Sequence, residues 1–506
     1  MRRAFIAVSV ISALAILPAP PVSAGPDDFT FYGGGWGHGL GLSQWGAYGL
    51  AREGWGAGRI VRHFYRGTRI ETVEMPESLR IGLVQGQAKV RLEAQAGPVD
   101  LRLGGRDPAD TVASVPAGET WTVRATDRGY RILDASGDPV GPAVGGPATN
   151  LYAVYVPNGA RVRIPEAGHT YARGWIEFNL YSCASSCVIR LIAVVGPERY
   201  LYGLGEVPSS WPMAALRAQA IAARSYALSK VRRYGQHRPV CNCALYASSY
   251  DQVYVGWDKE AATDGDRWVA AVDATAGRVA TYDGTVIEAF YMSSSGGYTE
   301  NNENVWDSSP IPYLRGVCDP GDYTPANPNR VWTVRYSTSE LTQRLSLGVG
   351  TVTGFTDVVR GVSGRIVEAT VVGENGSVRV DGDLIRSRLG LPDDRVWINR
   401  NRLVVGAIRE KYDALGCSPG LPTSKQVEVA GGLRQAFERA TIYHSTATGA
   451  HALRDPVLAF YKSKGGPAGK LGFPVSDVRT MPNGNLRAAF EHGTITCRPD
   501  GACWIS

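Results

Sequence analysis

A single acidic residue, Glu206, stands just before a run of small residues in the segment 200–228, which reads YLYGLGEVPSSWPMAALRAQAIAARSYAL. Its apolar neighbours Leu204, Val207 and Trp211 are expected to raise the pKa of the Glu206 carboxyl, because burial disfavours the charged form. A carboxyl group with a raised pKa can donate a proton as a general acid. Glu206 is therefore predicted to be catalytic. The alternative is a charge at the start of a helix that makes only a structural ion pair.

A helix is predicted directly after this carboxyl group. Ser209 and Ser210 can cap its first amides, and Pro212 suits an early helical position. From Met213 onward, alanine, leucine, arginine and glutamine favour a helix continuously. Small side chains recur at helical spacing and form a narrow stripe that can pack closely against a sheet. The members of this stripe are Leu216, Ala220, Ala223 and Ala227.

Two cations on the same predicted helix are further candidates. Arg217 and Arg224 share a face with Ile221 and Leu228, so both are expected among apolar neighbours. Buried cations need anionic partners or anionic ligands. We expect the two arginines to position the substrate or the site; the alternative is that they are ordinary ion-pair partners.

Near the N-terminus, residues 31–51 read FYGGGWGHGLGLSQWGAYGLA, and every second residue from Gly35 to Gly41 is glycine. If this segment is a strand, one of its faces carries no side chains, which indicates close approach of another backbone or of a ligand. The period of two argues against a phosphate-binding loop. His38 falls on the opposite face, either as a lining residue of the substrate site or as a structural histidine.

These segments resemble the SpoIID/LytB family of bacterial cell-wall proteins. The segment 200–228 is similar to the family's catalytic signature, and Glu206 falls on the catalytic position. VIEAFYMSSSGGYT at 286–299 and YLRGVCDPGD at 313–322 resemble two further family blocks, and 31–51 resembles a Gly-His-Gly-x-Gly-x-Ser-Gln motif. In many members that motif follows the Ser-Gly-Gly block. Its position here predicts a permuted order in which the N-terminal segment completes the site, within a domain spanning 25–400.

The resemblance also implies a set of substrate-binding residues, part of them in a polar loop at the site. The alternative for that loop is a turn without chemistry, since serine and glycine are common in turns. The implied substrate-binding residues are Arg217, Arg224, Tyr291, Ser293, Ser294, Ser295, Gly296, His38, Ser43 and Gln44.

The family resemblance implies action on cell-wall peptidoglycan, and one carboxyl group limits the chemistry. Ordinary glycosidases need two carboxyl groups. A lytic transglycosylase can use one, because the C6 hydroxyl of N-acetylmuramic acid itself attacks the anomeric carbon and leaves a 1,6-anhydro end. No cofactor or metal is expected. The alternative function is a non-catalytic modifier of an N-acetylmuramoyl-L-alanine amidase.

The fold class is predicted to be α+β. The 506 residues exceed what one small core needs, so more than one domain is expected. Polar and apolar residues alternate within 79–195, as in KVRLEAQ from Lys89, and this pattern predicts a β-rich body. Few helices are expected beyond those after Ser43, after Ser209 and near Asp383.

The last part of the chain, 401–506, contains an internal repeat. LRQAFERATI from Leu433 aligns with LRAAFEHGTI from Leu486, each after a proline-containing stretch. The two copies resemble LGFP repeats, which implies attachment to the cell envelope; the alternative is that they only pack against the first domain. The first copy departs from the motif, because Gly420-Leu421-Pro422 replaces Leu-Gly-Phe-Pro.

Residues 1–24 read as a signal peptide, with two arginines, an apolar run and a small-residue cleavage site. The protein is accordingly expected outside the cell or at its wall, and the alternative, an uncleaved membrane anchor, is disfavoured by the short apolar run. The net charge of +6 is too mild to indicate nucleic-acid binding.

The 8 cysteines fit an oxidising compartment. Cys183 can pair with Cys187 across a hairpin, and Cys497 with Cys503 around a terminal loop. The connectivity of the other four stays open. The alternative for two of these is a zinc site with His237, Cys241 and Cys243, for which a fourth ligand is missing.

Overall fold

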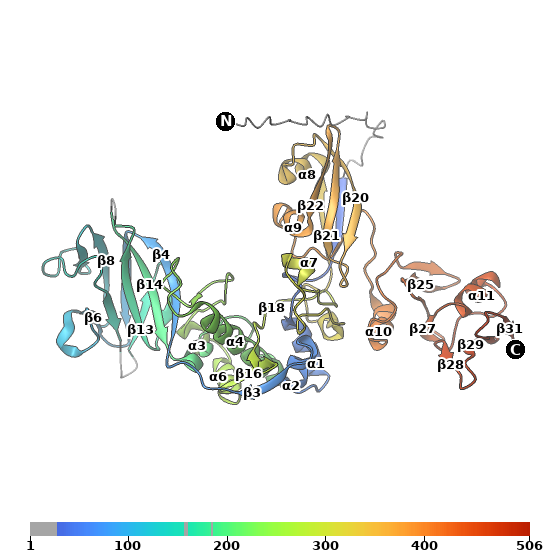
Figure 1. Ribbon diagram of the computed structural model, residues 1–506, viewed down its shortest axis with the longest axis horizontal. Helices are drawn as coiled ribbons and strands as arrows, with labels where there is room; N and C mark the ends of the chain where they lie inside the picture. Colours follow the sequence, from blue (N-terminus) through green and yellow to red (C-terminus); the bar gives the residue numbers. More distant parts are fainter. Residues whose placement is uncertain (1–27, 156–159, 184–185) are drawn as a thin grey trace, which may run out of the picture.

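The structure of the protein is a computed structural model that describes residues 28–155, 160–183 and 186–506. The predicted signal peptide, 1–24, lies outside the described residues. Figure 1 shows an elongated molecule, with a β-rich body at one end, a helical layer beside it, an upright β unit and a C-terminal pair of small sheets. The mixture of helices and separate, largely antiparallel sheets confirms the α+β class.

The β-rich body predicted for 79–195 is confirmed as two sheets. One has the strand order β15-β4-β14-β13-β10-β6-β7 and the other β12-β11-β5-β8-β9. The predicted alternation is visible in β5, where Val90, Leu92 and Ala94 are buried between exposed or half-buried neighbours. The strands are β4 (Leu79–Gln87), β5 (Lys89–Gln95), β6 (Val99–Leu103), β7 (Thr111–Val115), β8 (Thr120–Thr126), β9 (Gly129–Leu133), β10 (Leu151–Val154), β11 (Arg161–Ile164), β12 (His169–Tyr171), β13 (Trp175–Tyr181), β14 (Val188–Val195) and β15 (Leu245–Tyr246).

Helices are more numerous than the sequence predicted. The three expected helices are confirmed as α1 (Gln44–Arg52), α4 (Met213–Tyr234) and α9 (Gly382–Leu389). The described residues contain eight more: α2 (Ala57–Phe64), α3 (Pro197–Tyr202), α5 (Trp257–Ala261), α6 (Gly265–Asp273), α7 (Glu303–Trp306), α8 (Thr338–Leu345), α10 (Gly406–Ala414) and α11 (Val457–Ser463). Most are short, so their apolar periodicity is difficult to distinguish from that of a loop.

The capping prediction for α4 is wrong. The helix begins after Pro212, which is its N-cap and offers no side-chain hydrogen bond. Ser209 is buried, and its hydroxyl has no hydrogen-bond partner in the described part of the chain. The segment before α4 makes its own turn, in which the Trp211 amide donates to the Pro208 carbonyl. This turn separates the two serines from the helix.

The small-residue stripe of α4 is buried, as predicted, but its neighbours are mostly helices. α4 contacts α1, α2, α6 and the short strand β16 (Arg278–Tyr282), which pairs with β3 (Arg69–Thr72) and β17 (Thr285–Val286). Alanine side chains let these elements approach the α4 backbone closely.

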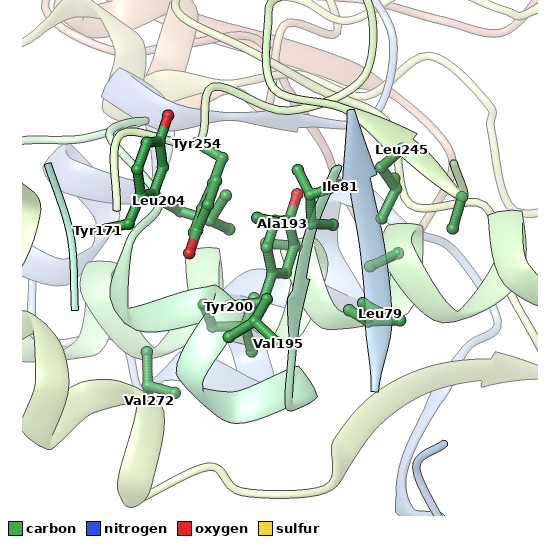
Figure 2. Close-up of a cluster of buried hydrophobic side chains, with 14 of the residues drawn as sticks. Leu79, Ile81, Tyr171, Ala193, Val195, Tyr200, Leu204, Leu245, Tyr254 and Val272 are labelled. Atoms are coloured by element: carbon green, nitrogen blue, oxygen red, sulfur yellow. The ribbon is translucent and has the colours of Figure 1, made fainter. Parts of the chain in front are cut away.

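The second half of α3 and the turn after it are anchored in the main core. Figure 2 shows Tyr200 and Leu204 packed beside Tyr254, next to side chains from β4 and β14. The rings of Tyr200 and Tyr254 lie 5.1 Å apart between centroids. This packing holds the backbone that carries Glu206 in a fixed place.

The N-terminal segment is built into two distant parts of the fold. β1 (Asp28–Gly33) pairs with β19 (Trp332–Ser337) and β23 (Val396–Ile398), and β2 (Leu42–Ser43) pairs in parallel with β18 (Tyr291–Met292). The glycine segment between β1 and β2 is not the strand that its period suggested, because Gly35, Gly37, Gly39 and Gly41 all have positive φ. The expected close approach is confirmed: a Cβ on Gly41 would lie 2.0 Å from the Phe290 carbonyl oxygen.

An upright unit with its own core follows the main body (Figure 1). Its sheet consists of β20 (Val352–Arg360), β21 (Ile366–Gly373) and β22 (Gly376–Asp381), covered by α8 and α9. No helix in the described part of the chain is long and apolar enough to span a membrane.

The C-terminal part forms two similar four-stranded sheets. Equivalent bridges join Pro422 to Phe437 in the first and Pro474 to Phe490 in the second, so the first copy keeps this geometry despite its altered motif. The exact boundary at residue 400 stays a prediction. The strands are β24 (Val427–Val429), β25 (Gly432–Ala436), β26 (Thr441–Ser445), β27 (Gly449–Leu453), β28 (Arg479–Thr480), β29 (Leu486–Phe490), β30 (Gly493–Cys497) and β31 (Cys503–Ile505).

Both predicted disulfides, Cys183–Cys187 and Cys497–Cys503, are present. The four open cysteines form Cys241–Cys243 and Cys318–Cys417. The last of these ties the main body to the segment that leads into the C-terminal sheets.

Candidate functional site

Glu206 lies in the turn between α3 and α4, against the strand-like segment 252–255. Leu204 and Tyr254 form a β-bridge, and the Gly205 amide donates to the Val253 carbonyl at 2.9 Å. The predicted apolar neighbours Leu204, Val207 and Trp211 are all buried. The turn is therefore held by backbone hydrogen bonds and by the core beneath it, while Glu206 itself is half-buried.

The Glu206 carboxyl accepts hydrogen bonds from two parts of the chain. The Val253 amide donates to Oε1 at 2.7 Å, and the Tyr291 hydroxyl donates to the same oxygen at 3.0 Å. The Gln44 side chain lies close enough to the carboxyl to favour its charged form. Because Oε1 already accepts two hydrogens, the neutral acid favours its proton on Oε2.

A relay of side chains fixes the Tyr291 hydroxyl. Gln252 donates from Nε2 to that hydroxyl at 2.9 Å, and its Oε1 accepts from Tyr200 at 3.0 Å. Gln252 is fully buried, so its amide is locked by these partners and by the Ala223 carbonyl. The relay orients the Tyr291 hydrogen toward Glu206.

Burial raises the pKa of Glu206 above its usual value, and its hydrogen bonds and the charge of Lys259 limit the rise. Lys259 lies on α5 and donates to the Val207 carbonyl. Burial lowers the pKa of Lys259 to about 8, while the Glu206 charge acts in the opposite direction. A carboxyl group that holds its proton more tightly than usual, next to a cation, is suited to proton transfer in both directions.

Aromatic side chains pack together on the two segments that carry Glu206 and Gln44. Trp211 contacts Trp45 at 4.7 Å and Tyr48 at 5.2 Å between ring centroids. Trp211 is 7% exposed, whereas Trp45 and Tyr48, both on α1, are half-buried. We call Trp45, Tyr48 and Trp211 the aromatic wall.

Three of the predicted substrate-binding serines instead surround a buried pair of carboxyl groups. Asp322 accepts from the Ser43 hydroxyl at 3.0 Å and from the Ser294 hydroxyl at 2.9 Å. The Ser295 hydroxyl donates to Asp319 at 2.6 Å. All five residues are buried, so these serines join the N-terminal motif to the Ser-Gly-Gly loop rather than facing solvent.

The pKa values of these two carboxyl groups, Asp319 and Asp322, are both raised. Burial raises the pKa of Asp319 well above its usual value, and the neighbouring Asp322 charge adds to the rise. Asp322 is also raised by burial, but its several hydrogen bonds favour the charged form. Of the two, Asp319 is therefore the member whose pKa is shifted further toward the neutral form.

The rest of the loop makes backbone contacts. The Ser293 carbonyl accepts from the Trp45 amide at 3.0 Å, which links the loop to α1. A Cβ on Gly296 would lie 2.4 Å from the Gly34 carbonyl oxygen, so this glycine permits two segments to touch.

His38 lies in a different cavity, of about 480 Å³, next to α7 and the upright unit. Its ring packs on Trp306 at 5.5 Å, and its Nδ1 accepts from the Leu40 amide at 3.0 Å. Burial lowers the pKa of His38 to about 4, and the charges of Arg386 and Arg365 act in the same direction. His38 is thus neutral at physiological pH.

The two arginines of α4 have separate environments. Arg224 is 0% exposed and holds Glu198 through two hydrogen bonds, one of 2.9 Å from Nε, and also donates to the Arg278 carbonyl. This arrangement anchors α3 to α4 and leaves no Arg224 surface for a glycan. Arg217 is exposed, contrary to the apolar surroundings expected for both.

The zinc alternative loses two ligands, because Cys241 and Cys243 are joined in a disulfide. His237 contacts the Asn242 side chain at 2.7 Å. Another cluster, Cys318, Asp413 and Cys417, also contains a disulfide, and only its carboxylate remains as a donor.

The structure therefore brings Gln44 and Tyr291 to Glu206 and distributes the other candidates elsewhere. Sequence reasoning missed Lys259, Gln252 and two members of the aromatic wall, Trp45 and Tyr48. Trp45 directly follows Gln44 in the N-terminal motif, so its position was a usable signal. Lys259 and Gln252 lie in a segment without a recognised motif, and only the fold reveals their proximity.

Comparisons with known proteins agree with the resemblance. Residues 186–282 match the family model "Stage II sporulation protein" (SpoIID), and residues 420–469 match the LGFP repeat model. The family match includes Glu206 and ends before Tyr291.

Curated relatives match part of the chain. Stage II sporulation protein D of Bacillus amyloliquefaciens is 31% identical over 203 residues, which cover 38% of this chain and 57% of that protein. The protein of the same name from Bacillus subtilis (strain 168) is 32% identical over 209 residues, with the same two shares. Amidase enhancer of Bacillus subtilis (strain 168) is 37% identical over 136 residues, or 27% of this chain and 16% of that protein. The matches thus span little more than half of these relatives at most. The similarity to the SpoIID family thus rests on part of the chain, residues 186–282, and the similarity to the LGFP repeat on residues 420–469.

Proposed function

We propose that the protein is a secreted lytic transglycosylase that cleaves peptidoglycan strands between N-acetylmuramic acid and N-acetylglucosamine. The observation that carries the proposal is the environment of Glu206, a single carboxyl group with a raised pKa in a SpoIID segment. Its hydrogen-bond partners in the described part of the chain are a backbone amide and a phenol, and the charge that acts on its pKa is the cation of Lys259. A mechanism with one carboxyl group fits this set, whereas ordinary glycosidases use two.

In the first half-reaction, neutral Glu206 donates its proton to the glycosidic oxygen as the bond from that oxygen to C1 of N-acetylmuramic acid breaks. In the second, the Glu206 carboxylate accepts the proton of the C6 hydroxyl while O6 bonds to C1. The product is a 1,6-anhydro end, and Glu206 is neutral again. No water is consumed.

The neighbours of Glu206 have complementary roles in this proposal. Tyr291 and the Val253 amide keep Oε1 in place, which leaves Oε2 to exchange the proton. The Lys259 charge stabilises the carboxylate between the two half-reactions. The aromatic wall offers ring faces against which a sugar can pack.

We propose that the LGFP repeat holds the protein at the cell envelope. The match at 420–469 supports this, and the disulfide Cys318–Cys417 ties that region to the main body. The glycan strand would be the substrate of the main body and the envelope the partner of the repeats.

A second candidate is a non-catalytic modifier of an amidase. The identity of 37% to a protein named Amidase enhancer favours it. In that case Glu206 would hold the site together without proton transfer.

The test compares wild type, Glu206→Gln and the exposed control Glu74→Gln on intact and stem-stripped peptidoglycan, with mass spectrometry of the fragments. We expect 1,6-anhydro ends from wild type and the control, and none from Glu206→Gln, which should still bind the strands. If wild type binds both substrates and cuts neither, the transglycosylase proposal fails. Stimulation of a purified amidase by wild type and Glu206→Gln alike would then support the second candidate.

A further inference from the structure

A cavity of about 650 Å³ lies on the β-rich body, and Glu206 is not among the residues that line it. It is bordered by the ends of β10, β11 and β13 and by the first turn of α5. Six of its lining residues carry the argument: Arg106, Arg161, Arg173, Arg199, Trp175 and Trp257. No acidic residue is among those that line it.

Arginines and tryptophans are paired in this cavity. The Arg106 guanidinium lies 3.7 Å from the Trp175 ring centroid, and the Arg161 guanidinium lies 4.4 Å from that of Trp257. A guanidinium stacked on an indole keeps its N–H groups in a fixed plane and free to bind an anion. The stacking thus presents two positive charges in defined orientations.

The positive charge of the cavity is mostly unbalanced. Arg173 pairs with Glu260 at 2.7 Å. For Arg106, Arg161 and Arg199, no carboxylate of the described residues lies within ion-pair distance. Like charges gathered around one cavity repel one another, and an oxyanion would offset this repulsion while accepting charge-assisted hydrogen bonds.

The size and the walls of the cavity indicate more than a bare ion. A volume of about 650 Å³ falls in the range of small-molecule sites, which combine apolar walls with a few placed polar groups. The two half-buried indoles, with Tyr155 and Ala172, supply such walls. A sugar ring that carries an oxyanion has both the required apolar surface and the required charge.

We propose that this cavity, which we call the arginine cavity, binds a saccharide bearing a phosphate or carboxylate group. The oxyanion contacts Arg161 and Arg199, and the sugar ring contacts the tryptophans. The site is separate from the Glu206 chemistry and does not depend on it. Helix α5 contacts both sites. Trp257 lines the arginine cavity, and Glu260 pairs with Arg173 of that cavity. Lys259, on another face of the helix, donates to the carbonyl of Val207, the residue after Glu206.

The test titrates the full-length protein with glucose 6-phosphate, glucuronate, inorganic phosphate and glucose, with tryptophan fluorescence and calorimetry as readouts. We expect saturable binding of glucose 6-phosphate, at least tenfold weaker binding of inorganic phosphate, and no binding of glucose. The double variant Arg161→Gln/Arg199→Gln should weaken glucose 6-phosphate binding at least tenfold. The control Arg128→Gln, in an exposed turn of the same body, should leave it unchanged.

Each outcome decides part of the proposal. Binding of glucose 6-phosphate alone assigns the site to phosphate-bearing sugars, and binding of glucuronate alone assigns it to carboxylate-bearing ones. Equal binding of glucose, or equal binding by the double variant with an unchanged circular dichroism spectrum, would overturn the oxyanion site. Equal binding of inorganic phosphate would overturn the contribution of the sugar ring. Because no assay here measures glycan cleavage, failure of this proposal and failure of the transglycosylase are distinguishable.

Discussion

The charge of Lys259 influences the pH range over which Glu206 gains and loses its proton. The raised pKa of Glu206 keeps the acid neutral at a pH where an exposed carboxyl group has lost its proton. Lys259 limits this rise, so that in the proposed mechanism the carboxylate stays accessible for its role as the base. For a group with a raised pKa, the active neutral form is complete at low pH and is lost as the pH rises through that pKa.

Lys259→Gln is therefore predicted to move the alkaline limb of the kcat/KM profile for peptidoglycan cleavage to higher pH. Removal of the cation raises the pKa of Glu206 further, and kcat should fall because the carboxylate is less stable. Glutamine retains a donor for the Val207 carbonyl. Lys89→Gln, exposed on β5, is the matched control. A limb that stays in place or moves to lower pH would contradict the role given to Lys259.

Trp45 offers the second prediction for a single residue. It is half-buried, and its ring centroid lies 4.7 Å from that of Trp211, which follows Glu206 in the same turn segment. If the aromatic wall packs on a sugar ring, Trp45→Ala should raise KM about fivefold, which corresponds to about 1 kcal/mol. Trp45→Phe should recover most of the affinity, because it keeps an aromatic face. Equal losses in both variants would argue against ring packing.

At the scale of elements, α1 reaches the site through the buried carboxyl pair. Its N-cap Ser43 is held by Asp322, and a Cβ on Gly46 would lie 2.3 Å from an oxygen of Asp319. The same pair holds Ser294 and Ser295, so α1, β18 and η2 (Pro320–Tyr323) meet at this point. The position of Gln44 at Glu206 depends on this junction.

Asp319→Asn is predicted to remove a pH dependence of stability. The raised pKa of Asp319 means that wild type is most stable while this carboxyl group is neutral and loses stability as the pH rises through that pKa. Asparagine is neutral at every pH. Between pH 6 and 9, the Tm of wild type and of the exposed control Asp383→Asn should fall by on the order of 2 °C or more. The Tm of Asp319→Asn should not show this fall. Parallel curves for wild type and Asp319→Asn would contradict the assignment of the proton.

Elements with local signals were predictable from the sequence, and their long-range partners were not. β5 followed from its alternation, and α4 from its run of helix-favouring residues. Ser294 and Ser295 belong to the motif that the sequence showed, but the partners of their hydroxyl groups could not be predicted. A serine that binds a buried carboxyl group looks the same in sequence as a serine that binds a ligand. Arg224 is a similar case, since its partner Glu198 lies 26 residues away on another helix.

At the scale of the whole molecule, covalent and ionic links join the main body to the C-terminal sheets. Cys318–Cys417 closes a separation of 99 residues, and Lys411 on α10 pairs with Asp477 at 2.5 Å. A crosslink over such a distance stabilises mainly by restricting the unfolded chain, by about 4–5 kcal/mol in the simplest account. The placement of the repeats relative to the main body is thus partly fixed.

Cys318→Ser/Cys417→Ser is predicted to lower Tm and to speed proteolytic cleavage in the segment 399–405, between β23 and α10. The control Cys183→Ser/Cys187→Ser removes a bond across only 4 residues, so its effect on Tm should be smaller. Limited proteolysis followed by intact-mass measurement reports the cleavage point. Unchanged cleavage in the first double variant would show that noncovalent contacts alone hold the repeats.

The insertion of β1 between β19 and β23 has a consequence for when the site can form. The Thr30 amide bonds Asn399, 369 residues later in the chain. Contacts over such separations form late, because the chain between the two residues must close into a loop before the contact can contribute favourable free energy. Gln44 begins α1, which is held to β18 and to η2, so it cannot be fixed at Glu206 until the chain has been synthesised beyond Tyr323 and has folded. A partly made chain therefore contains Glu206 without its complete surroundings, and the proposed competence for glycan cleavage arises only after these later segments have folded.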